Sequence, residues 1–180
     1  MDAERWGERI VRAYRSDLLV CPAPFPVPDF FEFYLPQKYK VKSGPAELPP
    51  GHEGLTEPPG SVLLAGHVYE AMLDGQPRAR FTPVHEGAHA IVHLPTLRKL
   101  NCRLVEGVGL TLYRREDLPS YADPEWQANR IAGAILMPKY PVQMLVEKYG
   151  HDASALEEIF QVSRAAAEVR LDQAKRMGWI

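Results

Sequence analysis

Two histidines stand four residues apart in the segment HEGAH, and a glutamate follows the first of them. In an α-helix this spacing places His85 and His89 one turn apart on the same face, with Glu86 beside them. Two such imidazoles can bind one zinc ion, but a catalytic zinc takes a third protein ligand and keeps one position open. The spacing therefore requires a fold that brings a third ligand to this helix from another part of the chain.

Two histidines are weak candidates for that third ligand. His93 lies roughly 12 Å from His85 along the helix axis, too far for both to bind one ion through bonds of about 2 Å unless the helix breaks. No glycine lies between His89 and His93 to indicate such a break. We interpret His93 as a residue near the helix C-terminus, where the helix dipole favours it. His67 follows a predicted strand and has no partner at ligand spacing.

Glu125 is the better placed candidate. It falls in the first turn of a later predicted helix, and Asn129 follows it by four residues, so both lie on one face. Glu125 can then bind the metal while Asn129 orients one of the histidine ligands through a hydrogen bond. The alternative is structural: a glutamate near a helix N-terminus can serve the helix dipole alone, and the two histidines can be ordinary surface residues.

Proline and glycine divide the first third of the chain. Residues 3–19 are predicted to form an amphipathic helix, because apolar side chains recur every four positions among charged ones. The prolines of residues 22–28 favour an extended segment, and residues 43–60, rich in Pro and Gly, are predicted to form a loop. The aromatic run of residues 30–34 is interpreted as a strand or a hydrophobic patch.

The next segments change from strands to helices. Residues 61–66 are a short apolar run that predicts a buried strand, residues 67–73 a short helix, and residues 104–114 a β-hairpin about a Gly-containing turn. Asp123 as the N-cap and Pro124 as the first residue predict the start of a helix.

The last part of the chain is predicted to be helical. One helix begins at Pro141 and ends at Gly150. The segments 154–160 and 164–178 then read as two helices joined by a short turn, a helix-turn-helix-like pair.

Composition limits the class of protein. Hydrophobic residues make up 46% and charged residues 24%, as in an ordinary globular protein, and a net charge of −2 gives no electrostatic reason for a nucleic-acid partner. The longest apolar run near the N-terminus, residues 18–21, is too short for a signal peptide or a membrane span, so we expect a cytoplasmic protein without a membrane partner. Cys21 and Cys102 form no C-x-x-C motif, so any metal is expected on His and carboxylate side chains.

Three segments, taken in order, resemble the ImmA/IrrE family of bacterial metallopeptidases. They are FTPVHEGAH at residues 81–89, PEWQANRIAGAILMP at residues 124–138 and FQVSRAAAEVRL at residues 160–171. The resemblance implies that His85, His89 and Glu125 bind zinc and that Glu86 is the general base. Tyr121 and His93 are candidates for the residue that stabilises the oxyanion.

The resemblance also implies a fold and a function. The fold is α+β and zincin-like, with a small twisted sheet packed against the active-site helix and a helical C-terminal part. We expect one domain over residues 1–180: an N-terminal helix and Pro-rich extended region at 1–60, a zinc-binding core at 61–150 and the helical pair at 151–180. The implied function is a zinc-dependent endopeptidase that cleaves a helix-turn-helix repressor-type regulatory protein, as members of the family do.

Two residues depart from the family pattern. The family usually has leucine in place of Pro83 and a larger apolar residue in place of Gly87. Because proline inside a helix removes a hydrogen bond, we expect Thr82 to be the N-cap and Pro83 the first helical residue. Gly87 lowers helix propensity by about 1 kcal/mol relative to alanine.

Two other functions compete with the peptidase. One is a protein-docking regulatory module that retains the peptidase shell and binds a transcription factor or antitoxin without cleaving it. The other is DNA binding through four basic residues of the C-terminal pair: Arg164, Arg170, Lys175 and Arg176. Because Glu168 and Asp172 interrupt that patch, we do not expect direct binding to nucleic acid.

Overall fold

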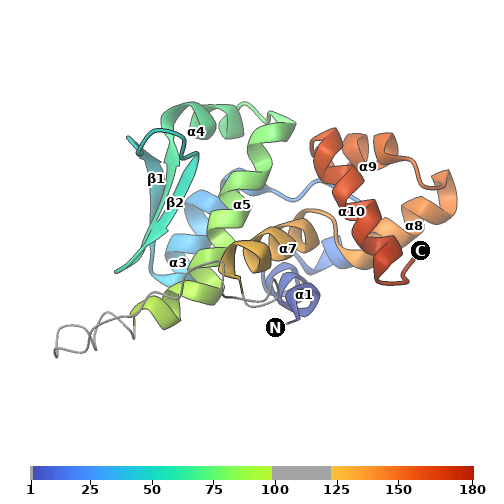
Figure 1. The fold of residues 1–180 in the computed structure, drawn as a ribbon, viewed down its shortest axis with the longest axis horizontal. Coiled ribbons are helices and arrows are strands. Elements are labelled where there is room, and N and C mark those ends of the chain that lie inside the picture. Colours follow the sequence, from blue (N-terminus) through green and yellow to red (C-terminus); the bar gives the residue numbers. More distant parts are fainter. Residues whose placement is uncertain (1, 99–122) are drawn as a thin grey trace.

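The computed structural model of the chain, shown in Figure 1, describes residues 2–98 and 123–180. They form a three-stranded sheet and a larger set of helices, which confirms the α+β fold class. The strands are β1 (Lys42–Ala46), β2 (Gly54–Glu57) and β3 (Ser61–Ala65). The helices are α1 (Ala3–Tyr14), α2 (Val27–Asp29), α3 (Leu35–Tyr39), α4 (Gly66–Leu73), α5 (Phe81–Ala88), α7 (Pro124–Leu136), α8 (Lys139–Tyr149), α9 (Ala153–Phe160) and α10 (Arg164–Arg176).

The sheet and the C-terminal helices lie at opposite ends of the molecule, as Figure 1 shows. Helix α5 runs beside the sheet, and α7 crosses from α5 toward α10 with α1 packed against it. One buried hydrophobic cluster includes side chains from α1, the sheet, α5, α7 and α10. None of the helices within the described residues is long and apolar enough to cross a membrane.

The sheet has the order β1-β3-β2, so the predicted strand at residues 61–66 is confirmed and is central. It pairs in parallel with β1 and antiparallel with β2. The prediction of a loop over residues 43–60 is wrong, because that range contains β2 and all of β1 except its first residue. Both are short edge strands that, among the described residues, pair only with β3. Pro45 is tolerated in β1 because an edge strand has one neighbour, so the missing N–H affects a single set of inter-strand hydrogen bonds.

The aromatic run at residues 30–34 is helical, so the strand interpretation is wrong. A π-helical turn, Phe30–Tyr34, joins α2 to α3 and makes a continuous helical segment. Proline in the first turn of α2 favours this start, because its fixed φ suits a helix. Phe30 and Phe31 are fully buried, so the run is the hydrophobic patch that was the other interpretation.

The helix that carries HEGAH begins earlier and continues farther than predicted. A 3₁₀ turn, Pro77–Arg80, leads into α5 at Phe81, so Thr82 is not the N-cap. Pro83 is the third residue of α5, still within the first turn, where backbone N–H groups have no partner inside the helix. Beyond α5 the chain forms a π-helical turn, His89–His93, and stays helical through residue 98. His93 therefore lies inside a helix and not at its C-terminus, which corrects our interpretation.

Gly87 is explained by the packing of α5. A Cβ atom at this position would lie 2.8 Å from Cε1 of Phe30 and 3.2 Å from Cδ1 of Leu35. The absence of a side chain lets α5 approach the aromatic helical segment closely. The cost in helix propensity is therefore offset by the close contact between the two helices.

The helices of the C-terminal part follow their predicted signals. Asp123 caps α7 by accepting a hydrogen bond from the backbone N–H of Glu125, and Pro124 is the first residue. Helix α8 begins two residues before the predicted Pro141 and ends at Gly150. Helices α9 and α10 form the expected pair. The predicted hairpin at residues 104–114, with Cys102 and Tyr121, lies outside the described residues.

A buried ion pair joins the first helix to the last. Arg170 of α10 is 1% exposed and donates two hydrogen bonds to the carboxylate of Glu4 on α1, at 2.6 and 2.9 Å. It also donates to the carbonyl oxygen of Met137 at 2.9 Å, and its guanidinium lies 4.8 Å from the ring centre of Trp179. Arg170 is therefore not on a DNA-facing surface, which corrects the basic patch considered for the C-terminal pair.

Candidate metal centre

The two histidines of HEGAH point their Nε2 atoms toward one place. Nε2 of His85 lies 3.1 Å from Nε2 of His89. Each side chain is 13% exposed, so both imidazoles are largely buried. This is the arrangement predicted by their spacing of four residues on a helix.

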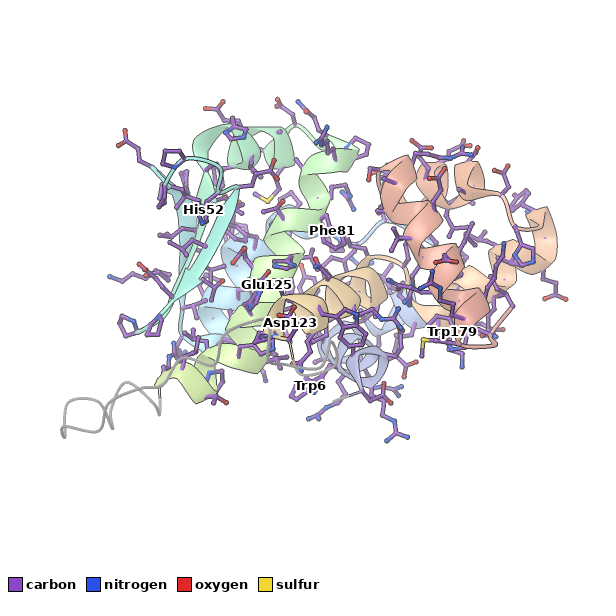
Figure 2. The ribbon with its side chains drawn as sticks, viewed as in Figure 1. Trp6, His52, Phe81, Asp123, Glu125 and Trp179 are labelled. Carbon is purple, nitrogen blue, oxygen red and sulfur yellow. The ribbon has the colours of Figure 1, made fainter. Side chains whose placement is uncertain are left out.

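Glu125 is the third member of the group. Its Oε2 lies 3.2 Å from Nε2 of His85, and its Oε1 lies 3.2 Å from Nε2 of His89. The cap on α7 puts Glu125 in the first turn, and Figure 2 shows this residue where α7 meets α5. The ligand atoms of the three residues all lie within 4.8 Å of one another.

The three residues suit a small divalent metal ion. The two Nε2 atoms lie 3.1 Å apart, and each lies 3.2 Å from a different carboxylate oxygen of Glu125, close to the roughly 3.3 Å expected between ligands of a tetrahedral zinc with bonds of about 2 Å. Two imidazole nitrogens and one carboxylate are also a donor set that zinc accepts in catalytic sites. The residues present therefore fit the ion that the sequence implies.

The histidines are held in the form that can bind a metal. Burial lowers the pKa of His85, and burial together with the charge of neighbouring His85 lowers the pKa of His89 to about 4. Both imidazoles are therefore neutral near pH 7, and a neutral imidazole has a lone pair available for coordination.

Glu86 faces a cavity of about 400 Å³ beside this group. The cavity is lined by His52, Gly54, Leu55, Thr56, Glu86, His89 and Glu125. Glu86 is only 7% exposed, and burial raises its pKa to about 7. The hydroxyl of Thr56 donates to Oε2 of Glu86 at 2.7 Å, which favours the charged form and opposes that rise.

Strand β2 also leaves room for Glu86. A Cβ atom at Gly54 would lie 2.6 Å from Cγ of Glu86, so only glycine fits beside the carboxylate without moving it. Sequence reasoning missed Gly54 and Thr56, because they lie in the segment predicted to be a loop. The segment GLTE has no alternation of apolar and polar residues that would have identified a strand.

Asn129 lies one turn after Glu125 on α7, as expected. Hydrogen bonding with its side chain is among the interactions that raise the pKa of His85, against the larger effect of burial. Nδ1 of His85, however, is buried without a hydrogen-bond partner among the described residues. The geometry therefore places Asn129 beside His85 but assigns it no bond to the Nδ1 atom.

The other two histidine candidates lie outside the group. Nδ1 of His93 lies 3.0 Å from Nδ1 of His89, and Nε2 of His93 lies 3.0 Å from Oε1 of Gln127, so its ring nitrogens face residues other than Glu125. His67 is exposed and lines a different cavity, together with Glu53. Of the three candidates, only Glu125 lies beside the Nε2 atoms of both histidines.

The H-E-x-x-H segment at residues 85–89 and Glu125 of α7 together form a candidate metal centre beside the sheet. A protein with such a centre is the class that the fold and the site indicate. The chain belongs to the family of the IrrE N-terminal-like domain, a peptidase family, whose model matches residues 68–172. That range contains all four residues of the centre and confirms the resemblance inferred from the sequence.

The fold is also similar to that of a solved structure. A Mycobacterium tuberculosis transcriptional regulator superposes with a TM-score of 0.62 at 14% sequence identity. The match covers 94% of this chain and 46% of the regulator, so the chain spans about half of the regulator's length. A comparison with curated proteins found no significant match.

Proposed function

We propose that the chain is a zinc-dependent endopeptidase. His85, His89 and Glu125 would hold the ion, and Glu86 would be the general base. The observation that supports this most directly is the convergence of three ligand atoms within 4.8 Å, beside a cavity that Glu86 also lines. Membership in a peptidase family agrees with this chemistry.

When bound, zinc supplies Lewis-acid activation of water and of the scissile carbonyl. Glu86 accepts the proton of the attacking water and then delivers it to the leaving amine. A carboxylate with a pKa raised to about 7 suits both steps, because it binds and releases a proton near neutral pH. Thr56 holds one oxygen of Glu86 in place, so that the other is available to the water.

The substrate is proposed to bind beside β2. This strand stands at the end of the order β1-β3-β2, and its residues Gly54, Leu55 and Thr56 line the cavity. An extended peptide can add to a sheet edge through backbone hydrogen bonds. Such pairing would place a peptide bond next to Glu86.

The substrate class we propose is a helix-turn-helix repressor-type regulatory protein. The family resemblance carries this proposal, and the structural similarity to a transcriptional regulator agrees with a regulatory setting. The test is incubation with a helix-turn-helix regulator encoded next to this chain, with zinc and with a chelator. Zinc-dependent fragments in mass spectra support the proposal; an intact regulator under every condition contradicts it.

The role of Glu86 is tested by Glu86→Gln. The variant should bind zinc in the same stoichiometry as wild type and lose cleavage by a factor of 10² or more, since a general base contributes about 10²–10⁴-fold. Glu57→Gln, an exposed change on the same strand as Thr56, is the matched control and should cleave normally. Cleavage by Glu86→Gln at the wild-type rate would exclude Glu86 as the base.

A second candidate is a docking module that binds a transcription factor or antitoxin without cleaving it. The observation that favours it is the fold shared with a longer transcriptional regulator. Under this function, Glu86→Gln would bind the partner as wild type does, and neither protein would produce fragments. The same experiment therefore separates the two functions.

A further inference from the structure

His93 belongs to the helix of the metal centre but is not one of the three proposed ligands. Its ring lies next to that of His89, with 4.9 Å between the ring centres. Nδ1 of His93 is 3.0 Å from Nδ1 of His89, and Nε2 of His93 is 3.0 Å from Oε1 of Gln127. The three side chains therefore form a hydrogen-bonded row that leads away from the ligand atom Nε2 of His89.

Hydrogen-bond chemistry gives this row a direction. A neutral imidazole that binds a metal through Nε2 carries its proton on Nδ1, which must then find an acceptor. The atom opposite Nδ1 of His89 is Nδ1 of His93, which accepts only when its own proton is on Nε2. Nε2 of His93 faces the carbonyl oxygen of the Gln127 side chain, which is an acceptor. The imidazole N–H groups of His89 and His93 then each meet an acceptor.

We propose that His93 and Gln127 are positioning residues that hold His89 in the tautomer with a free Nε2. His93 accepts the Nδ1 proton of His89 and donates its own Nε2 proton to Gln127. The inference rests on the proposed function in one respect, namely that His89 is a metal ligand.

The row counters a competing interaction at the other nitrogen of His89. Oε1 of Glu125 lies 3.2 Å from Nε2 of His89 and would accept a proton from it, which favours the tautomer that cannot bind a metal. An acceptor at Nδ1 shifts the balance toward the metal-binding tautomer. Without His93, the metal would have to displace a proton that Glu125 stabilises on Nε2.

Local structure explains why the row forms. His89 and His93 begin and end a π-helical turn, in which the backbone N–H of Leu94 bonds to the carbonyl of His89. Gln127 is 8% exposed and lies on α7 two residues after Glu125, so one helix supplies both the third ligand and the last acceptor of the row. Packing of α7 against α5 thus sets both interactions at once.

Zinc affinity tests the inference through His93→Leu and His93→Gln. Leucine fills similar space without polar atoms, whereas glutamine can accept from His89 and donate to Gln127. Competition with a chromogenic chelator should show zinc binding 10- to 100-fold weaker in His93→Leu, the usual effect of losing a residue that orients a ligand, and largely restored in His93→Gln. Gln127→Leu should weaken binding in the same direction. Equal affinity in wild type and His93→Leu would overturn the inference.

A second measurement distinguishes this role from a merely structural one. In zinc-loaded protein labelled with ¹⁵N at histidine, Nδ1 of His93 should have the shift of an unprotonated nitrogen and Nε2 that of a protonated one. A scalar coupling between the Nδ1 atoms of His89 and His93 should report the hydrogen bond itself. A proton found on Nδ1 of His93 would overturn the inference even if His93→Leu failed to fold.

The outcomes separate this inference from the proposed function. If wild type and His93→Leu bind zinc with equal affinity, the proposed role of His93 is contradicted and the metal centre is not. If the protein binds zinc with the expected tautomer of His93 but cleaves no regulator, the peptidase function is contradicted and the role of His93 is not. Failure of wild type to bind zinc contradicts both.

Discussion

Glu86 depends on two residues of β2 that have no acidic or basic group. Thr56 fixes one carboxylate oxygen by a hydrogen bond of 2.7 Å, and Gly54 leaves the space that the side chain occupies. Neither residue could be predicted from the sequence, since their proximity to Glu86 arises from tertiary packing. His85, Glu86, His89 and Glu125 could be named, because helical spacing and a helix cap are local signals.

Gly54→Ala tests the fit around Glu86. The new Cβ would lie 2.6 Å from Cγ of Glu86, so the carboxylate must move, and a displacement of about 1 Å can cost about 10²-fold in rate. We expect kcat to fall by a factor of 10 to 100 while zinc stoichiometry stays unchanged. Gly44→Ala in β1 is the matched control, because a Cβ there would have no neighbour within 4 Å. Equal activity in the two variants would contradict this account.

The buried histidines predict how stability depends on pH in metal-free protein. The pKa of His89 falls from an ordinary value of 6.5 to about 4 on folding, so the unfolded chain binds a proton that the folded chain excludes. The stabilising effect is complete above pH 6.5 and is lost as the pH falls toward 4. The full loss should be roughly 3 kcal/mol, since the pKa falls from 6.5 to about 4 and one pKa unit corresponds to about 1.4 kcal/mol.

Urea denaturation of the chelator-treated protein at several pH values measures this effect. His89→Gln is the control, because glutamine does not titrate. Glu86, whose pKa is raised to about 7, also titrates in this pH range and has the opposite effect on stability, but it is present in both proteins. Between pH 6.5 and 5, the unfolding free energy of wild type should therefore fall relative to that of His89→Gln. Parallel curves would show that His89 is not buried as described.

At the scale of elements, local signals predicted helices better than strands. Asp123 and Pro124 marked the start of α7, and a short apolar run marked β3. The edge strands β1 and β2 could not be recognised, because Pro and Gly disfavour strands and only pairing with β3 makes these segments extended. The π-helical turns had no signal in the sequence either, since they are rare single-turn interruptions of α-helices.

Gly87→Ala tests the contact between α5 and the aromatic helical segment. Alanine improves helix propensity by about 1 kcal/mol, but its Cβ would come within 2.8 Å of Phe30. Overpacking costs about 1–3 kcal/mol, so we expect a net loss of unfolding free energy in urea denaturation. The double variant with Phe30→Leu should recover part of the loss. Greater stability of Gly87→Ala than of wild type would mean that the contact relaxes freely.

At the scale of the whole molecule, the pair of Glu4 and Arg170 links segments 166 residues apart. Sequence reasoning considered Arg170 only as part of an interrupted basic patch, since nothing in its own helix indicated a partner on α1. A charged residue at 1% exposure requires a matched opposite charge, and Glu4 provides two hydrogen bonds to it. Such a pairing depends on the complete fold and is invisible to local patterns.

Glu4→Gln tests this link. The change leaves a buried guanidinium without a counter-charge, which typically costs about 3–5 kcal/mol of unfolding free energy. Asp172→Asn is the control, because it breaks the pair with Arg176 in which both side chains are more than half exposed and should cost about 1 kcal/mol at most. Urea denaturation of both variants gives the comparison. Similar small effects would show that Arg170 is hydrated.

The pair of Glu4 and Arg170 also determines when the buried contacts of α1 can form during synthesis of the chain. Glu4 leaves the ribosome long before Arg170 is made, so α1 cannot complete its buried contacts until α10 has emerged. Helix α1 packs against α7, which carries Glu125. A nascent chain therefore exposes HEGAH while the helix that supplies the third ligand still lacks its final support. The candidate metal centre therefore reaches its final packing only after α10 has been made.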